Sequence, residues 1–245
     1  MPNYVTSKCQ VVGPTHEIDR FKATVIREAP VGHSDAGGMM LDFNAIIPMP
    51  ESVRGTEAGG HADIGIALII ARGSSVAPFS TLGLYEHNIQ WIRGEAALGY
   101  DASISDVAKA FLIKHPEIAD KGLCCLRALV ETGYTDWYSW SIANWGTKWG
   151  AFRFVELNGE AYYSFQFETA WSFPTPIFHK LAVEFPLLGF NCVTFDEGGN
   201  FAGDGWFNAP KGGKVFEIGE ATDALYERVY GHPRPTGDDE DDSTS

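Results

Sequence analysis

The chain has 245 residues and a formal charge of −14, and its 44% apolar and 13% aromatic residues are sufficient for a sizeable core. Only 18 Lys and Arg are spread along it, which disfavours non-specific binding to nucleic acid or to an anionic membrane surface, because both need clustered cations. An acidic body of this kind can meet a basic partner surface, imitate the charge of DNA, or simply keep the protein soluble.

The N-terminal residues and the cysteines both bear on the compartment of the protein. Residues 1–8 lack the apolar core of an export signal, and the longest apolar run, residues 64–71, is too short to span a bilayer. We therefore expect a cytoplasmic protein with no membrane association. The cysteines contain no Cys-x-x-Cys pair, so we expect them to be reduced and mostly buried. They are Cys9, Cys124, Cys125 and Cys192.

The first fifty residues predict a strand, a helix and a second strand. Residues 3–13 alternate apolar and polar side chains, as a strand does. Thr15 is expected to cap a helix whose apolar residues recur at helical spacing until Pro30 ends it. After a glycine-rich loop, residues 40–48 predict a second strand.

The region after residue 50 has a different sequence pattern. Residues 51–65 predict an irregular excursion, and residues 64–71 predict a short buried segment whose type the pattern leaves open. Three helices are then predicted, with Ser105 capping the second and Gly133 ending the third. Their apolar residues include Leu84, Ile89 and Ile92, then Val107, Phe111 and Leu112, then Ile118, Leu126 and Leu129. We treat residues 51–135 as a mainly helical insertion.

Four of the seven tryptophans lie between Trp137 and Trp149, at spacings of three, five and four residues. One helix or strand cannot bury all four rings on one side at those spacings, so we expect some of them to line a junction or a cleft. The polar and small residues at 144 and 146–148 favour a turn with hydrogen-bond donors. We expect this segment to join the two halves of the molecule.

The β pattern resumes after the tryptophans. Residues 151–157 and 161–169 alternate strongly and are separated by Asn158-Gly159, which is typical of a hairpin. Thr175 is expected to cap the following helix.

The last quarter of the chain predicts short elements and a tail. Residues 190–195 predict a strand, and residues 206–207 and 214–218 are candidate edge strands. Residues 221–230 predict an amphipathic helix. Residues 231–245, which end in an acidic run, are expected to be disordered.

The predicted order is strand-helix-strand, insertion, strand-helix-strand, which is the order of a ferredoxin-like α+β sandwich with an antiparallel sheet. Specific stretches also match a known family: Met1–Thr6, Phe43–Pro50, Asn144–Trp149, Thr169–Ser172 and Asp196–Gly199. In these stretches the sequence resembles the YubB-type, Api-like proteins, which contain a ferredoxin-like domain and are carried by phages and conjugative plasmids of bacteria. The resemblance implies a ferredoxin-like domain formed by residues 1–50 and 136–230, and it implies no established activity.

Aromatic and polar residues of these stretches are candidate ligand contacts. A ferredoxin-like sheet would bring the ends of its strands together, so the residues are expected to converge on one cleft where rings stack on a planar group and Lys148 pairs with an anion. The candidates are Asn144, Trp145, Thr147, Lys148, Trp149, Trp171, Asp196 and Glu197. The alternative is structural, with the tryptophans in the core and Lys148 bridging one of the two carboxylates. A site for single-stranded nucleic acid would add Arg and Lys around the rings, and these are missing.

Metal binding has little support in the sequence. His61 and Asp63 could lie on one side of a strand, with His87 or His33 adding a ligand, but no Cys/His framework accompanies them. We therefore expect no metal and no cofactor.

Catalysis also lacks a signature. The Gly-x-Ser-x-Gly, phosphate-loop and dinucleotide-binding motifs are absent. Glu168, or the Asp196-Glu197 pair, could supply acid and base carboxylates, so enzymatic activity stays open while no catalytic residue is assigned.

The sequence therefore predicts a non-enzymatic phage or plasmid accessory protein that acts in the bacterial cytoplasm by binding a host protein or protein complex. An inhibitor of a host defence system, of the anti-restriction or anti-CRISPR type, is one form of this hypothesis. The alternative is a small-ligand or nucleotide-binding protein, which could be an enzyme, that uses a tryptophan-lined cleft. The oligomeric state is not predicted.

Overall fold

The computed structural model describes residues 3–74, 79–157 and 162–235. Its contacts divide the chain into two compact units. Unit 1 consists of Met1–Pro48 and Ser141–Ser245, and unit 2 consists of Met49–Trp140. The chain thus leaves unit 1 after residue 48 and returns to it inside the tryptophan-rich segment.

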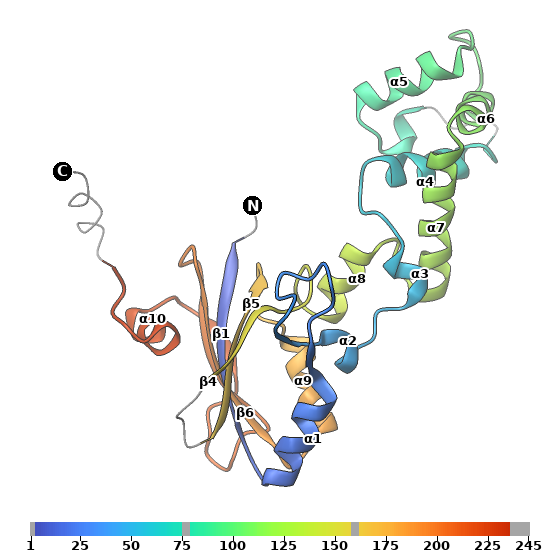
Figure 1. Ribbon diagram of the computed structural model, residues 1–245. Coiled ribbons are helices and arrows are strands. Elements are labelled where there is room, and N and C mark those ends of the chain that lie inside the picture. The colour runs from blue at the N-terminus through green and yellow to red at the C-terminus, as the bar shows by residue number, and fades with distance from the viewer. Residues whose placement is uncertain (1–2, 75–78, 158–161, 236–245) are drawn as a thin grey trace. The chain divides into compact units, whose positions relative to one another are not determined.

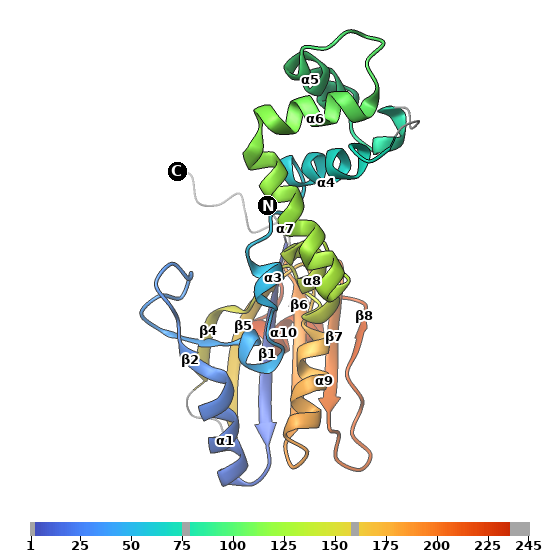
Figure 2. The same ribbon diagram turned by 90° about the vertical axis from the view of Figure 1, so that its right-hand side faces the viewer.

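Unit 1 contains a six-stranded sheet in the order β4-β5-β1-β6-β7-β8, and neighbouring strands pair antiparallel (Figure 2). The strands are β1 (Tyr4–Val12), β4 (Phe152–Leu157), β5 (Tyr163–Ala170), β6 (Gly189–Asp196), β7 (Ala202–Phe207) and β8 (Glu217–Gly219). The prediction of an α+β protein with an antiparallel sheet is confirmed. The predicted Asn158-Gly159 hairpin turn between β4 and β5 lies outside the described residues.

Two helices, α1 (Thr15–Val25) and α9 (Thr175–Glu184), cover one face of this sheet (Figure 2). Each buries an apolar stripe, because its large residues recur at helical spacing. Phe21 of α1 and Phe178 of α9 both contact Phe190 of β6, with ring centroids 5.5 and 6.1 Å apart. The main core of unit 1 therefore lies between these helices and the sheet.

The opposite face carries the C-terminal helix α10 (Asp223–Tyr230) (Figure 1), which falls within the helix predicted over residues 221–230. Val229 of this helix packs against Val193 and Phe195 of β6, and these side chains form a second, smaller apolar cluster. The helix covers only part of the face. Residues 236–245, which include the acidic run, lie outside the described residues.

The predicted strand over residues 40–48 is wrong. The strand β3 (Met39–Leu41) is short and pairs with β2 (Ile26–Glu28) in a separate two-stranded sheet. Asp42 then caps the helix α2 (Phe43–Ile46), with its carboxylate accepting the N–H of Asn44 at 2.9 Å. The apolar residues of this stretch recur at a helical spacing of three and four, and the cap favours that reading over alternation.

Some predicted helix caps are displaced. Thr15 and Thr175 are the first residues of their helices, and neither helix has a side-chain cap bond. Ser105 lies inside its helix, which is instead capped by Ser103, whose Oγ accepts the N–H of Asp106 at 3.1 Å. Position in the first turn, more than residue type, decides which hydroxyl can reach a free N–H.

Unit 2 is helical in its described residues. Its helices are α3 (Glu51–Arg54), α4 (His61–Ala71), α5 (Glu86–Ala96), α6 (Ile104–Lys114) and α7 (Pro116–Thr132), with a 3-10 turn at Phe79–Leu82. The last three helices confirm the prediction, whereas part of the expected irregular stretch 51–65 is helical. Leu68, Ile92 and Phe111 are fully buried at the centre of this unit.

Candidate functional site

The tryptophan-rich segment forms a helix followed by a tight turn. Helix α8 (Trp137–Asn144) ends where the sequence predicted a turn. The backbone N–H groups of Trp145 and Gly146 both donate to the carbonyl of Ser141, at 2.8 and 3.1 Å. Gly146 has a φ of +80°, and a β-carbon there would lie 2.7 Å from Pro176. The turn therefore needs glycine at this position.

Two of the predicted ligand contacts hold this turn in place. Trp145 is 5% exposed, and its indole Nε1 donates to the carbonyl oxygen of Ile47 at 2.9 Å. Thr147 is fully buried, and its hydroxyl donates to the carbonyl oxygen of Ala170 at 2.7 Å. Their polar atoms are used inside the protein, because Thr147 anchors the turn to the end of β5 and Trp145 anchors it to the residue after α2.

Lys148 lies between two indole rings. Its Nζ is 4.8 Å from the ring centroid of Trp149 and 4.9 Å from that of Trp171, distances at which an ammonium group is attracted to an aromatic face. Trp171 is 38% exposed and has a φ of +73°, which is uncommon for a residue other than glycine. Among the described residues, no carboxylate lies within ion-pair distance of Lys148.

The predicted carboxylates at the end of β6 bind the backbone and a neighbouring amide. Asp196 is 1% exposed and accepts from the backbone N–H and the side-chain amide of Asn200, at 3.1 and 2.6 Å. Glu197 accepts the backbone N–H of Tyr4 at 2.8 Å. Neither makes the bridge to Lys148 that the structural alternative proposed. Asn144 is partly buried at the last position of α8.

A pocket of about 340 Å³ lies beside Trp149 in unit 1. Its lining residues are Tyr4, Gly32, His33, Ser34, Trp149, Gly150 and Phe152. The rings of Tyr4 and Phe152 meet edge to face, with centroids 5.1 Å apart. Of these residues, the sequence singled out only Trp149 as a ligand contact. The Met1–Thr6 stretch was the available signal for Tyr4, and nothing in the sequence linked the glycine-rich loop to it.

Asp35 holds that loop against β4. Its carboxylate accepts the backbone N–H groups of Arg153 and Phe154, at 2.8 and 3.3 Å. Arg153 has a φ of +51° at a shift in the β4–β5 register. Two backbone donors thus compensate a carboxylate that is 11% exposed, and the loop wall of the pocket is fixed.

The Arg153 guanidinium donates to Glu168 at 2.8 Å, and this carboxylate is 15% exposed. Burial raises the pKa of Glu168 above its ordinary value, Arg153 opposes that shift, and the nearby charges of Glu197 and Asp35 add to it. Arg153 also lies 5.5 Å from the Tyr4 ring. Glu168, the candidate acid or base, is therefore engaged in an ion pair with Arg153 next to the pocket.

The metal hypothesis placed His61 and Asp63 on a strand, and this is wrong, because both lie in the first turn of α4. No cluster of three or more His, Cys, Asp or Glu suited to a metal ion occurs within residues 3–74, 79–157 and 162–235. In those same ranges, every helix is too short or too polar to cross a membrane.

Comparisons with known proteins add little to this geometry. No protein-family model matches the chain, and no curated protein matches it. Among solved structures, the chain is similar to the crystal structure of a protein api92 from Yersinia pseudotuberculosis. The family given for that protein is DUF1281. The identity is 11% and the TM-score 0.40, over 91% of this chain and 99% of that chain. At this identity and score, the similarity assigns neither a fold nor an activity.

Proposed function

We propose that the protein acts by binding, and that the pocket beside Trp149 receives a small, planar, anionic ligand such as a nucleotide. The supporting observation is a hollow of about 340 Å³ walled by the rings of Tyr4, Trp149 and Phe152. The ammonium group of Lys148 lies 4.8 Å from one of these rings. Pockets of this size with mostly aromatic walls and a few polar groups are typical of small-molecule sites.

The charges around the pocket favour an anion over a cation. No lining residue carries a carboxylate. Two half-buried carboxylates next to the lining residues are compensated, because Asp35 accepts two backbone N–H groups and Glu168 is paired with Arg153. Lys148 has no carboxylate partner among the described residues, so its charge is available to a ligand that stacks on Trp149.

Calorimetric titration with adenosine and AMP tests this proposal. The change of Trp149 to Leu should weaken binding of both by about tenfold, because stacking on an aromatic ring is worth about 1 to 3 kcal/mol per base. The change of Lys148 to Gln should weaken AMP binding and leave adenosine binding unchanged. Lys109→Gln, an exposed change in unit 2, is the matched control for loss of charge. Failure of both ligands to bind, or equal binding by Trp149→Leu, would contradict the proposal.

A second candidate is the binding of a basic host protein by an accessory protein of a phage or plasmid, for example to inhibit a defence system. The acidic charge of −14 favours a basic partner. Unit 2 also exposes large apolar side chains, and Tyr100, Ile113 and Val130 are 94%, 81% and 89% exposed. Exposed apolar residues of this kind are available to a protein partner.

A pull-down from host lysate tests the second candidate. The wild-type protein should retain a host protein that the double variant Ile113→Ser, Val130→Ser loses. Val183→Ser, which changes a 74% exposed residue of α9, is the control. Recovery of nothing above background by the wild type would count against this candidate.

We further propose that unit 1 is ferredoxin-like. The order β6-β1-β5-β4, with α1 and α9 on one face, supports this assignment. In this arrangement β4 takes the place that the sequence gave to residues 40–48. An experimental structure in which β4 does not pair with β5 would overturn it.

A further inference from the structure

We propose a second binding site, in unit 2, for a guanidinium group such as that of an arginine side chain. It is a pocket of about 510 Å³ lined by α4, by α5 and by the residues just before each of these helices. All of its lining residues belong to unit 2, so it is separate from the pocket beside Trp149. The side chains that carry the proposal are His61, Asp63, Tyr85, His87, Asn88 and Trp91.

Trp91 forms a fixed aromatic wall of this pocket. Its ring meets the fully buried ring of Phe111 edge to face, with centroids 5.0 Å apart, so the core of unit 2 holds it in place. The imidazole of His61 is stacked on the same indole at a centroid distance of 5.8 Å. Ile64, which belongs to the core of the unit, also lines the pocket. The wall is therefore in position before a ligand arrives.

A second pair of rings lies at the start of α5. The rings of Tyr85 and His87 are stacked, with an interplanar angle of 11° and centroids 5.7 Å apart. Tyr85 is 76% exposed, so most of its surface is open to a ligand. His87 and Trp91 are four residues apart in α5 and lie on the same side of this helix. The two pairs of rings therefore border one hollow.

The charge of the pocket favours a cation. Among its described lining residues, Asp63 is the one carboxylate, and neither Lys nor Arg is present. Asp63 is exposed and has no ion-pair partner in the described part of unit 2. The carboxylates of this unit that do form ion pairs there are Glu51, Glu57, Glu95 and Glu117. The charge of Asp63 is therefore available to a cationic ligand.

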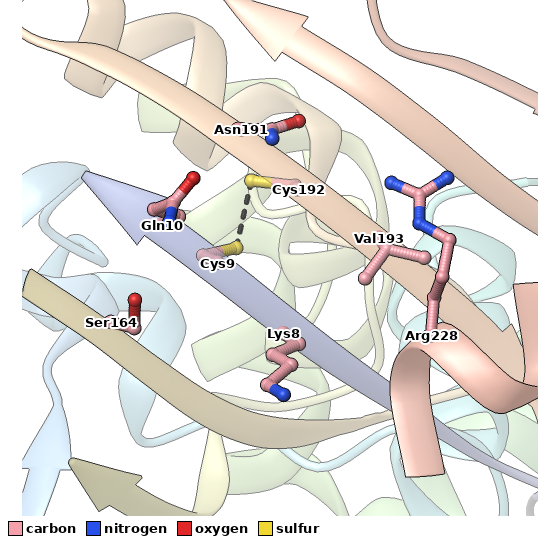
Figure 3. A pocket seen from close by; sticks show the side chains of 8 residues that line it. All are labelled: Lys8, Cys9, Gln10, Ser164, Asn191, Cys192, Val193 and Arg228. Atoms are coloured by element: carbon pink, nitrogen blue, oxygen red, sulfur yellow. Dashed lines mark hydrogen bonds between the residues drawn. The ribbon is translucent and has the colours of Figure 1, made fainter. Parts of the chain in front are cut away.

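These groups suit a guanidinium better than an ammonium or an anion. A guanidinium is flat, stacks on aromatic rings and donates two parallel hydrogen bonds to a carboxylate. Asp63 supplies the carboxylate, and Asn88 adds an amide oxygen that can accept a further hydrogen bond. The pocket on the α10 face of unit 1 differs in charge, because two cationic residues, Lys8 and Arg228, line it (Figure 3).

NMR titration of the ¹⁵N-labelled full-length protein with Nα-acetyl-arginine amide tests the site. At about pH 7.5, imidazole is ordinarily neutral and does not repel the probe. Saturable shifts should appear at the indole N–H of Trp91 and at the backbone amides of Asp63 and Asn88. Nα-acetyl-citrulline amide has nearly the same shape without the charge, and it should bind about tenfold more weakly. Equal binding of the two probes would overturn the proposal, as would the absence of saturable shifts with the arginine probe.

Two exposed substitutions test the carboxylate and the ring separately. Asp63→Asn should weaken binding of the arginine probe by about tenfold, as the loss of a charge-assisted hydrogen bond does. Tyr85→Ser should weaken it by about threefold, as the loss of a cation–π contact at an exposed site does. Asp120→Asn, which changes an exposed carboxylate of α7, is the matched control and should bind like the wild type. Equal binding by the Asp63 and Asp120 variants would overturn the proposal.

A blocked pentapeptide with one arginine between glycines identifies the source of the guanidinium. Tighter binding of the peptide than of the arginine probe supports a side chain presented by a protein partner. Equal or weaker binding of the peptide supports a free guanidinium compound. These titrations use neither AMP nor a host lysate, so their outcome is independent of the tests of the two candidate functions.

Discussion

Gly65 and Gly122 meet where α4 packs against α7 in unit 2. A β-carbon on Gly122 would lie 2.8 Å from the Cα of Gly65 and 2.7 Å from the backbone nitrogen of Ile66. The two helix backbones are therefore in direct contact. Gly122→Ala should force them apart and lower the free energy of unfolding by about 1 to 3 kcal/mol, as overpacked substitutions do.

Urea unfolding followed by circular dichroism measures this change, and Gly94→Ala is the matched control. Gly94 lies inside α5, and a β-carbon at this position would point into open space. Alanine there should stabilise the helix by up to about 1 kcal/mol. Equal effects of the two substitutions would show that the contact between α4 and α7 is looser than described.

Thr147→Val should destabilise unit 1. The hydroxyl of this fully buried residue is bonded to the carbonyl of Ala170, and valine has the same shape without the donor. Loss of this hydrogen bond should lower the free energy of unfolding, measured by urea unfolding, by about 1 to 2 kcal/mol. Thr24→Val removes an exposed hydroxyl bond within α1 and should change stability by less than about 0.5 kcal/mol. A Thr147 variant as stable as the wild type would remove this anchor from the description of the turn.

Glu168→Gln should change how stability depends on pH. Because burial raises the pKa of Glu168 above 4.5, the folded state holds this proton more tightly than the unfolded state. The contribution of Glu168 is therefore greatest at low pH and is lost as the pH rises through the folded-state pKa. Glutamine does not ionise, so the unfolding free energy of the wild type minus that of the variant should fall as the pH rises from the ordinary pKa of a glutamate through the raised pKa of Glu168 in the folded state. A constant or rising difference would contradict the raised pKa.

Cys9 and Cys192 should resist alkylation in the folded protein. They pair in register across β1 and β6, both are 1% exposed, and their Sγ atoms lie 2.7 Å apart. Burial and the neighbouring thiol of Cys9 raise the pKa of Cys192, which disfavours the reactive thiolate. Cys124 is only partly buried. Peptide mass spectrometry after iodoacetamide treatment should find Cys124 modified first, and rapid labelling of Cys192 would contradict this arrangement.

Where the local sequence pattern fits only one kind of element, it predicts the elements of unit 1 correctly. Where the pattern fits both a strand and a helix, it does not. The alternation at residues 3–13 corresponds to β1, because one face of that strand is buried beneath α1 and α9. Residues 40–48 were misread because their apolar residues fit both a strand and a short helix, and the cap formed by Asp42 settles the choice. The pattern of residues 64–71 does not distinguish a helix from a strand, because they are apolar all round, as a buried helix or strand can be.

For the candidate site, the sequence does not show which side chains are buried or which distant loops lie beside them. The sequence placed Lys148, Trp149 and Trp171 in one group, and the structure brings their side chains together, while ligand binding by them stays a prediction. Trp145 was grouped with them because residue type does not tell which rings are buried. His33 enters the pocket only because Asp35 fixes a loop that is more than a hundred residues away in sequence from Trp149.

The hydrogen bond from Trp145 to Ile47 ties together the two places where the chain leaves unit 1 and returns to it. It joins residues that flank unit 2 on either side, so the two points at which unit 2 is spliced into unit 1 are neighbours in space. A short glycine-rich linker in place of residues 49–140 could close that gap and leave every strand pairing of the six-stranded sheet intact. Unit 2 can therefore be removed or replaced by design as one continuous segment, because both of its ends leave unit 1 from neighbouring points.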